Sequence, residues 1–348
     1  MFNFSSLLRP NIKNLTPYSS ARDEFKGEAS VFLDANENSL GSPLTKWYNR
    51  YPDPMQWKVK EKLAEIKGVP ASQIFIGNGS DECIDVLIRA VAEPGIDNIL
   101  ICPPTYGMYQ VSADINNVAV KKIPLTPAFQ LDLPAIENGI DENTKIIFIC
   151  SPNNPTGNSL IKEDVEVLLN NYFGLVVIDE AYINFSRFRS FTQELKDYPN
   201  LVVMQTLSKA WGLAALRVGM AFSSEEIITV MNKIKPPYNI NQASQDLVLN
   251  ALEEVGQVND MIRELVTQRG ILIAKLEALS VVSHVFPSDA NFLLVRVSAA
   301  QPIYNFLLGR GIVVRDRSKV ELCEGCLRIT IGTEQENDEL VKALQEYS

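Results

Sequence analysis

Histidine is almost absent from this chain of 348 residues, and cysteine is scarce. The sole histidine is His284, and the only Cys-x-x-Cys pair, Cys323 and Cys326, has no second pair of cysteine or histidine residues near it. A structural zinc site needs four such ligands, so the sequence predicts no metal centre. The cysteines number five, an odd count that favours reduced thiols over a disulfide framework.

Long apolar runs and an excess of positive charge are also missing. No stretch approaches about 18 uninterrupted apolar residues, and the first ten residues carry too short an apolar run for a signal peptide. We therefore expect a cytoplasmic protein that does not enter a membrane. The 32 Lys and Arg against 42 Asp and Glu give a net charge of −10, which would repel DNA or RNA, so nucleic acid is not an expected partner.

The composition is that of a globular protein of about two domains. Apolar residues make up 46% and charged residues 21%, and the 18 Gly and 19 Pro are near average usage, which excludes disordered and fibrous classes. From about residue 72 to 222, short β-branched runs alternate with helical patterns, which predicts an α/β fold with a mostly parallel central sheet and helices on both faces. The expected strands are 74–76, 98–102, 118–123, 145–150, 174–178, 201–205 and 218–222.

The pattern changes after Pro236 and Pro237. Residues 242–279 predict one extended helix, bent near Gly256, that leads into a smaller α+β domain. In that domain we expect strands at 281–285, 291–297, 311–315 and 327–331, and helices near 300–309 and 334–346. The predicted division is an N-terminal segment 1–45 packing with the small domain, a large domain 46–245, and the small domain 246–348.

The segment 77–82, GNGSDE, follows the first predicted strand and opens an amphipathic helix. Free backbone N–H groups and the positive end of the helix dipole meet there, so the segment could bind a phosphate. It matches neither the dinucleotide fingerprint nor a P-loop. Considered alone, the segment is better explained as a tight turn with Ser80 as helix N-cap.

Further polar side chains follow the ends of consecutive predicted strands. Each has an ordinary explanation by itself, such as an N-cap for Asp179, a core ring for Tyr182 or a solvated surface group for Lys209. Their common position at the carboxyl edge of the sheet, where open α/β sheets bind ligands, favours a joint site. The set comprises Asn154 in SPNNPTG, Asp179 and Tyr182 in DEAY, Thr206, Ser208 and Lys209 in TLSK, and Arg217.

Pyridoxal 5'-phosphate is a ligand that uses such a set. It needs a lysine amine for a Schiff base, a carboxylate at its ring nitrogen and donors to its phenolate oxygen. Hydroxyls, backbone N–H groups and an arginine suit its phosphate. In the order of these motifs the chain resembles the fold-type I pyridoxal-phosphate-dependent aminotransferases over almost its whole length.

Within that family the chain resembles the branch that acts on histidinol phosphate. The motifs that carry this narrower resemblance are LTPY at 15–18 leading to Arg22, DANEN at 34–38, RYPDP at 50–54, and GCLRITIGT at 325–333. The sequence departs from the common pattern at Ser39, Trp211 and Ala215, where many relatives carry other residues. These departures concern packing near the site and not the chemistry.

The resemblance implies a role for each matching residue. Lys209 would anchor the cofactor and shuttle the proton, Asp179 would pair with the ring nitrogen, and Tyr182 would donate to the phenolate oxygen. Tyr51 would reach the cofactor phosphate of a neighbouring subunit, which implies a homodimer. The other cofactor-binding residues expected are Asn154, Tyr106, Gly79, Ser80, Asp81, Thr206, Ser208 and Arg217, and the expected substrate-binding residues are Tyr18, Arg22, Asn36, Arg315 and Arg328.

The implied reaction moves the amino group of L-histidinol phosphate to 2-oxoglutarate, giving imidazole acetol phosphate and glutamate in histidine synthesis. Arginine suits both the phosphate of the donor and the carboxylates of the acceptor. For Arg315 and Arg317, a solvated strand edge is an equally good explanation. Alternatives with the same fold are an aromatic amino acid aminotransferase and a decarboxylase of phosphorylated amino acids, and a non-enzymatic alternative is a ligand-sensing scaffold.

Overall fold

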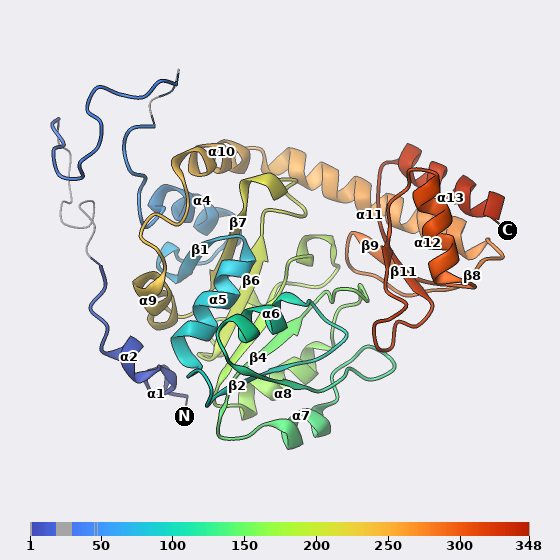
Figure 1. Cartoon of the computed structure of the whole chain (residues 1–348), viewed down its shortest axis with the longest axis horizontal. Helices are drawn as coiled ribbons and strands as arrows, with labels where there is room; N and C mark the ends of the chain where they lie inside the picture. The colour runs from blue at the N-terminus through green and yellow to red at the C-terminus, as the bar shows by residue number, and fades with distance from the viewer. Residues whose placement is uncertain (1, 19–29, 45, 47, 348) are drawn as a thin grey trace.

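The computed structural model of the chain describes residues 2–18, 30–44, 46 and 48–347. Its larger part is a seven-stranded sheet between layers of helices (Figure 1). The strand order is β1-β7-β6-β5-β4-β2-β3, and β7 runs antiparallel to β1 and β6 while the remaining pairs are parallel. The strands are β1 Ile74–Asn78, β2 Asn98–Ile101, β3 Ala119–Lys122, β4 Thr144–Cys150, β5 Leu175–Asp179, β6 Leu201–Thr206 and β7 Val218–Phe222. The expected α/β class and mostly parallel sheet are confirmed.

The central strands are buried on both faces, which explains their uninterrupted apolar runs. Successive side chains point to opposite faces, so Ile147 of β4 packs with Leu168 in one cluster and Phe148 packs with Ile84 in the other. Helices that contribute to the first cluster are α4 Trp57–Lys67, α7 Leu133–Gly139 and α8 Lys162–Asn171. The second cluster is covered by α5 Ser80–Val91, α6 Met108–Ile115 and α9 Glu225–Ile234.

Two helices replace the single connecting helix predicted for 242–279. Helix α10 spans Gln242–Leu252, and α11 begins at Val255 and runs to Glu277, so the break lies before Gly256. The expected boundary between 245 and 246 lies inside α10, which still packs on the large domain through Val248. Figure 1 shows α11 leading to the smaller domain. No helix in the described residues is long and apolar enough to cross a membrane.

The small domain is an antiparallel sheet of order β10-β11-β9-β8 that packs against α11 and two further helices. Its elements are β8 Val282–Val285, β9 Phe292–Val297, α12 Ala300–Gly309, β10 Arg315–Asp316, β11 Cys326–Thr330 and α13 Glu334–Tyr347. The prediction of a strand at 311–315 is wrong in its bounds, because the observed strand β10 spans only Arg315–Asp316. Only Arg315 and Asp316 pair with β11, while Val314 packs into the core and Val313 is exposed, so this run covers the end of α12 and does not extend the sheet.

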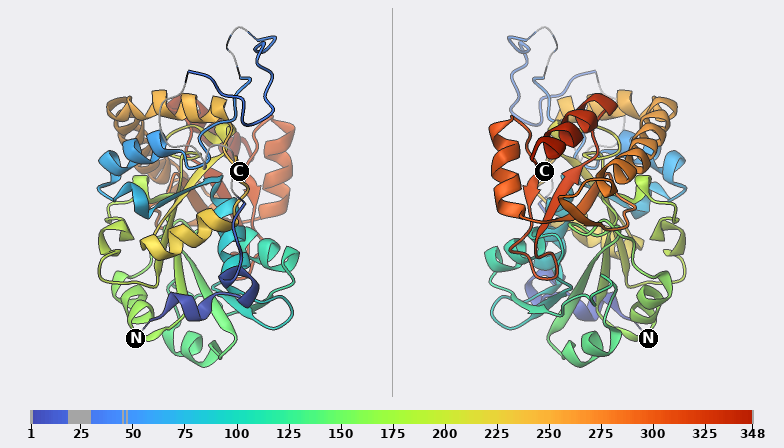
Figure 2. Two further views of the ribbon diagram at one scale, coloured as in Figure 1. Left: turned by 90° about the vertical axis from the view of Figure 1, so that its left-hand side faces the viewer. Right: turned by 90° about the vertical axis from the view of Figure 1, so that its right-hand side faces the viewer.

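The first residues of the predicted N-terminal segment pack on the large domain, whereas the prediction places this segment on the small domain. Helices α1 Phe4–Leu7 and α2 Pro10–Lys13 lie on the layer that contains α5, where Phe4 is buried and Arg9 pairs with Glu93 at 3.1 Å. Beyond α2 the described chain runs away from the body (Figures 1 and 2). Along this N-terminal arm, residues 14–18 and 30–44, Leu33 is 83% and Leu40 is 91% exposed.

Two glycines allow the helix α5 to begin directly against β7. Gly77 of β1 lies opposite Gly219 of β7 in the sheet register. A Cβ atom on Gly219 would lie 2.2 Å from the Ser80 amide nitrogen and 2.5 Å from the Gly79 carbonyl carbon. Backbone atoms cannot yield as a flexible side chain can, so only glycine at position 219 leaves room for this turn.

We therefore expect Gly219→Ala to lower the free energy of unfolding by about 1–3 kcal/mol, as overpacking of a rigid core does. The matched control is Gly270→Ala in α11, where nothing lies within 4 Å of the added Cβ. Removing a mid-helix glycine should stabilise the protein by up to about 1 kcal/mol. Urea unfolding followed by circular dichroism measures the free energy of unfolding of each variant. An equal effect of the two substitutions would contradict the close approach of Gly219 to the backbone of Gly79 and Ser80.

Candidate active site

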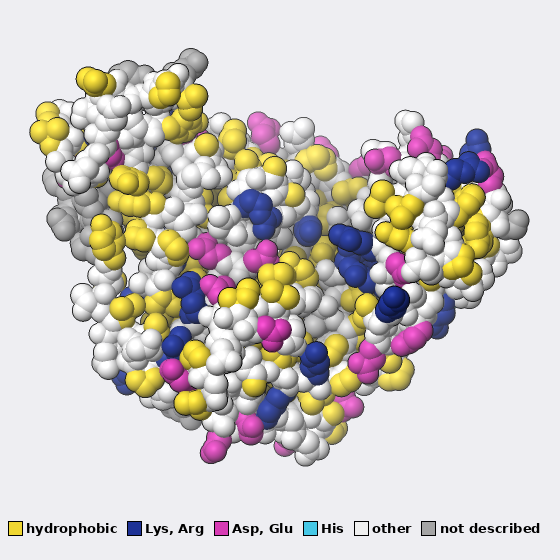
Figure 3. Space-filling view, in the orientation of Figure 1, with side chains coloured by type: hydrophobic (Ala, Val, Ile, Leu, Met, Phe, Trp, Pro, Cys, Tyr) yellow, Lys and Arg dark blue, Asp and Glu magenta, His cyan; other side chains and the backbone are white. Residues whose placement is uncertain are grey.

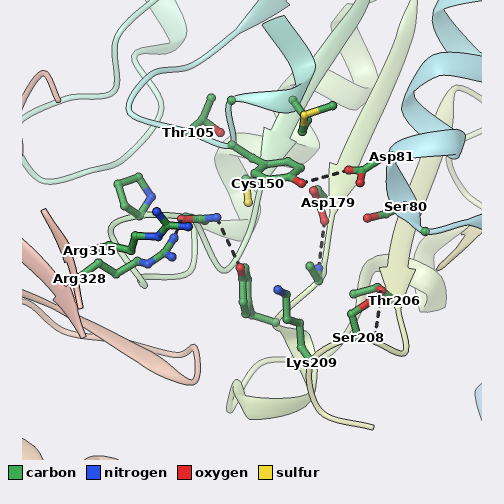
Figure 4. A pocket seen from close by; sticks show the side chains of 18 of the residues that line it. Ser80, Asp81, Thr105, Cys150, Asp179, Thr206, Ser208, Lys209, Arg315 and Arg328 are labelled. Carbon is green, nitrogen blue, oxygen red and sulfur yellow. Dashed lines mark hydrogen bonds between the residues drawn. The ribbon is translucent and has the colours of Figure 1, made fainter. Parts of the chain in front are cut away.

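A cavity of about 690 Å³ lies at the carboxyl edge of β4, β5 and β6, between the large domain and the small sheet. Figure 4 shows side chains from both sides pointing into it, with Lys209 and Asp179 between them. Thirteen of the residues expected at the site line this cavity. They are Gly79, Ser80, Asp81, Tyr106, Asn154, Asp179, Tyr182, Thr206, Ser208, Lys209, Arg217, Arg315 and Arg328.

Three expected residues do not line the cavity of the single chain, and a fourth lies outside the described residues. Tyr18 is 74% exposed on the N-terminal arm, which also carries Asn36. Tyr51 stacks on Tyr238, with ring centroids 4.5 Å apart and half of its surface exposed. Arg22 is the residue outside the described part. Figure 1 shows the arm that carries Tyr18 and Asn36 on the opposite side of the large domain from the small domain, whose arginines line the cavity.

Asp179 ends β5 and is almost fully buried. Its Oδ2 accepts a hydrogen bond of 2.7 Å from the Tyr109 hydroxyl, and its Oδ1 accepts one of 3.0 Å from the Ala181 amide. Burial raises the pKa of Asp179 to about 6, because desolvation disfavours the charge, while the two donors act in the opposite direction. At neutral pH the site therefore holds a desolvated carboxylate.

Lys209 lies in the turn after β6 and projects into the same cavity. Burial and the nearby guanidinium of Arg328 lower the pKa of its amine. The amine lies 5.7 Å from the centroid of the Tyr182 ring. A lysine with a lowered pKa presents more of its neutral form, which is the nucleophile that attacks carbonyl groups.

A chain of hydrogen bonds connects the small domain to the strand ends. Arg328 of β11 donates from Nη1 to the Asn154 Oδ1 at 2.6 Å, and Asn154 donates from Nδ2 to the Tyr182 hydroxyl at 3.4 Å. Burial raises the pKa of Tyr182 well above its usual range, so the phenol stays protonated. A phenol and an amide are thus directed toward the space above Asp179 and Lys209, where they can donate to an oxygen atom of a ligand.

The start of α5 forms one anion-binding end of the cavity. Amide groups in the first turn of a helix have no intrahelical acceptor, which leaves those of Ser80 and Asp81 available to a ligand. Thr206 and Ser208 bring hydroxyls 3.0 Å apart, and Arg217 lies beside them with its Nη2 3.4 Å from Asp81. Figure 4 shows Ser80, Thr206 and Ser208 on the same side of the site.

Gly79 is expected to bind the cofactor phosphate through its backbone amide, but in the structure this amide has another partner. Its N–H donates to the Arg217 carbonyl at 2.7 Å, so this amide is not available to a phosphate. A Cβ atom on Gly79 would lie 2.6 Å from the Arg217 Nη2, and Gly79 has a φ of +78°. Glycine is therefore needed here to make room for the Arg217 guanidinium and to adopt the left-handed backbone.

Three arginines of the small domain form the opposite end. Arg315 and Arg328 are direct cross-strand partners in the β10–β11 register, and Arg317 also lines the cavity. The buried Nε of Arg317 has no hydrogen-bond partner among the described residues. Like charges opposite one another destabilise a sheet, and an anion between them would remove that cost. Figure 3 shows dark blue side chains gathered at the hollow between the main body and the small domain.

The sequence interpretation missed two buried residues that support the site. Tyr109 lies in α6, three residues after Tyr106, and belongs to none of the sequence motifs named above. Glu180 follows Asp179 and accepts hydrogen bonds from Ser190 Oγ, from the Phe191 amide at 2.7 Å and from Gln205 Nε2 at 2.9 Å. Burial raises the pKa of Glu180 to about 7. These bonds hold both ends of the segment that carries Tyr182.

Comparisons with known proteins agree with this arrangement. The family model of aminotransferase class I and II matches residues 33–344. A histidinol-phosphate aminotransferase from Cytophaga hutchinsonii is 54% identical over 346 residues, covering 99% of both chains. The solved histidinol-phosphate aminotransferase from Clostridium acetobutylicum aligns with a TM-score of 0.80 and 26% identity, over 86% of this chain and 91% of that one.

A further solved structure shares the fold. It is a histidinol-phosphate aminotransferase from Sinorhizobium meliloti in complex with pyridoxal-5'-phosphate, with a TM-score of 0.77 and 24% identity. The alignment covers 85% of this chain and 82% of that one. The matches thus extend over both domains of the chain.

Proposed function

Because this chain belongs to the aminotransferases of class I and II, we propose that it transfers the amino group of L-histidinol phosphate to 2-oxoglutarate, using pyridoxal 5'-phosphate. The products are imidazole acetol phosphate and L-glutamate, and the reaction is a step of histidine synthesis. The observation that carries this proposal is the position of Lys209 and Asp179 between two separate anion-binding ends of one cavity. The names of the full-length relatives support the choice of substrate.

The side chains of the cavity fit the proposed cofactor. The amides of Ser80 and Asp81, the hydroxyls of Thr206 and Ser208, and Arg217 would hold its phosphate. When bound, pyridoxal phosphate makes the carbon next to the substrate amine acidic by withdrawing electrons from it. Residues of this protein would anchor the cofactor, move the proton and bind the substrates.

Lys209 is the anchoring amine and, when free, the base that moves a proton. Its lowered pKa places it closer to neutral pH, where a general base is effective. Asp179 offers a desolvated negative charge, which would stabilise a proton on the ring nitrogen of the cofactor. Tyr182 and Asn154 would donate hydrogen bonds to the phenolate oxygen of the cofactor.

The arginines of the small domain suit both substrates. Histidinol phosphate carries a phosphate and no carboxylate, whereas 2-oxoglutarate carries two carboxylates. The planar guanidinium groups of Arg315, Arg317 and Arg328 can bind either kind of anion through paired N–H groups. The unpartnered Nε of Arg317 is one donor that such an anion would satisfy.

We also propose that the enzyme is a cytoplasmic homodimer. All five cysteines are buried as free thiols, which suits a reducing compartment. The exposed apolar side chains of the N-terminal arm, including Leu33 and Leu40, suit burial against a second copy of the chain. In such a dimer Tyr51, held by Tyr238, would serve the cofactor of the neighbouring subunit, and Tyr18 and Asn36 would approach the substrate.

The substrate assignment is tested with a panel of amino donors and 2-oxoglutarate. We expect ping-pong kinetics and a kcat/KM for histidinol phosphate at least about 100-fold above those for phenylalanine and tyrosine, because a phosphate carries more charge and more acceptor oxygens for the three arginines than a single carboxylate does. Faster turnover of phenylalanine would indicate an aromatic aminotransferase, and release of CO₂ from a phosphorylated amino acid would indicate a decarboxylase. Binding of the cofactor without turnover of any donor would favour a ligand-sensing scaffold.

The anchoring role of Lys209 is tested by substitution and by chemical trapping. Lys209→Ala should lower kcat by about 1,000-fold or more, and Lys209→Arg, which keeps the charge but lacks a primary amine, should be equally inactive. Borohydride treatment of the wild-type holoenzyme should leave one reduced cofactor adduct, located by peptide mass spectrometry at Lys209. An adduct at another lysine would refute the assignment.

The charge of Asp179 should make cofactor binding depend on pH. The folded pKa lies above the usual value, so the carboxylate is ionised above about pH 6 and becomes neutral below it. Cofactor affinity should therefore weaken as pH falls through about 6. In Asp179→Asn this component should be absent, and kcat should fall by about 100-fold or more. Equilibrium dialysis of the wild type and of Asp179→Asn across pH 6 separates the contribution of Asp179 from titration of the cofactor phosphate. Identical dependence of cofactor affinity on pH in the two proteins would contradict the role of Asp179.

A further inference from the structure

Tyr109 is a fully buried tyrosine whose hydroxyl contacts a carboxylate of the active site. It lies in α6 and donates to Asp179 Oδ2 at 2.7 Å, although 70 residues separate the two in the sequence. Its ring stacks on Phe148 of β4 with centroids 4.9 Å apart and planes at 11°. The other neighbour is Tyr106, whose ring meets that of Tyr109 edge to face at 5.6 Å.

We propose that Tyr109 is a positioning residue of this enzyme, whose hydroxyl orients the Asp179 carboxylate toward the cofactor and whose ring sets the position of Tyr106. The proposal rests on the function proposed above, because it assigns Asp179 to the ring nitrogen of the cofactor. It concerns a residue that does not line the cavity and therefore touches neither cofactor nor substrate. Tyr109 acts only through Asp179 and Tyr106.

The geometry leaves the carboxylate one orientation. The Ala181 amide holds Oδ1 from the loop after β5, and Tyr109 holds Oδ2 from α6, so the two oxygens are fixed from different elements. The stacked ring of Tyr109 cannot rotate away, because Phe148 and Tyr106 occupy two sides of it. A carboxylate held in this way is preorganised for a cationic N–H group, and no reorganisation is needed when the cofactor binds.

The same hydroxyl favours the charged form of Asp179. A hydrogen bond to a carboxylate lowers the pKa of that group, and in this desolvated place few other donors are available. The thiol of Cys150, which lines the cavity, also contacts the Tyr109 hydroxyl. The other titratable groups around Asp179 are Asp81 and Cys83 on α5, Tyr106 before α6, and Tyr182 and Lys209 in the loops after β5 and β6.

Tyr109→Phe removes only the hydroxyl, and Tyr172→Phe is the matched control. Tyr172 is also buried, and its hydroxyl donates to the Thr144 carbonyl at 2.8 Å, remote from the cavity. In Tyr109→Phe we expect the pKa of Asp179 in the apoprotein to rise by about one unit, cofactor affinity to fall about tenfold, and kcat to fall about tenfold with little change in KM. In Tyr172→Phe all four quantities should match the wild type.

The Asp179 pKa is measured by ¹³C NMR titration of the aspartate-labelled apoprotein, with Asp179→Asn identifying the resonance. Cofactor affinity is measured by equilibrium dialysis. If Tyr109→Phe leaves the Asp179 pKa and the cofactor affinity at the values of Tyr172→Phe, the proposal is overturned. It is also overturned if Tyr109→Phe lowers cofactor affinity equally in the Asp179→Asn background, because the effect would then come from packing alone.

A second variant keeps the test decisive should Tyr109→Phe not fold. Replacing Tyr109 by 3-fluorotyrosine retains its shape but makes the phenol more acidic and a stronger donor, so the pKa of Asp179 should fall. An unchanged or raised pKa would contradict the proposal. Neither apoprotein titration uses an amino donor, so a wild-type enzyme that fails to convert histidinol phosphate would defeat the proposed function without deciding the role of Tyr109.

Discussion

The parallel pairing of β4, β5 and β6 is the constraint on which the site depends. In the observed register Cys150 lies opposite Asp179, and Asp179 lies opposite Met204. Neighbouring strands are about 4.8 Å apart, so the residues that follow these strand ends must meet at one edge. Asn154, Tyr182 and Lys209 each come from a different loop and still face one cavity. A shift of one residue in either pairing would turn Asp179 toward the opposite face of the sheet.

Burial of this edge gives the polar groups their chemical properties. Desolvation raises the pKa of Asp179 and lowers that of Lys209, so the same physical cause moves an acid and a base toward neutrality. Hydrogen bonds oppose the effect of burial on both carboxyl groups: Asp179 accepts two of them, and Glu180 next to it accepts three. The two adjacent carboxylates thus have different tasks: one faces the cavity, and the other holds the following loop in place.

The small domain supplies the part of the site that the large sheet cannot. Its antiparallel sheet places Arg315 and Arg328 opposite one another, and the bond from Arg328 to Asn154 joins the two domains across the cavity. In the proposed function, separate elements would therefore bind the two ends of a ligand. This arrangement allows one cavity to accept anions that differ in shape while the reacting groups stay on the rigid sheet.

The sequence by itself determined the buried strands to within one or two residues, because each is a continuous apolar run, and it determined which polar residues follow them. Tertiary structure alone decided which contacts form between residues that are far apart in the sequence. Tyr109 meets Asp179 only because α6 packs on β4, the Gly79 amide is taken by Arg217, and β10 is short because only two of its residues reach β11. Local patterns encode which residues are buried, whereas the partner of each hydrogen bond is set by how the elements pack.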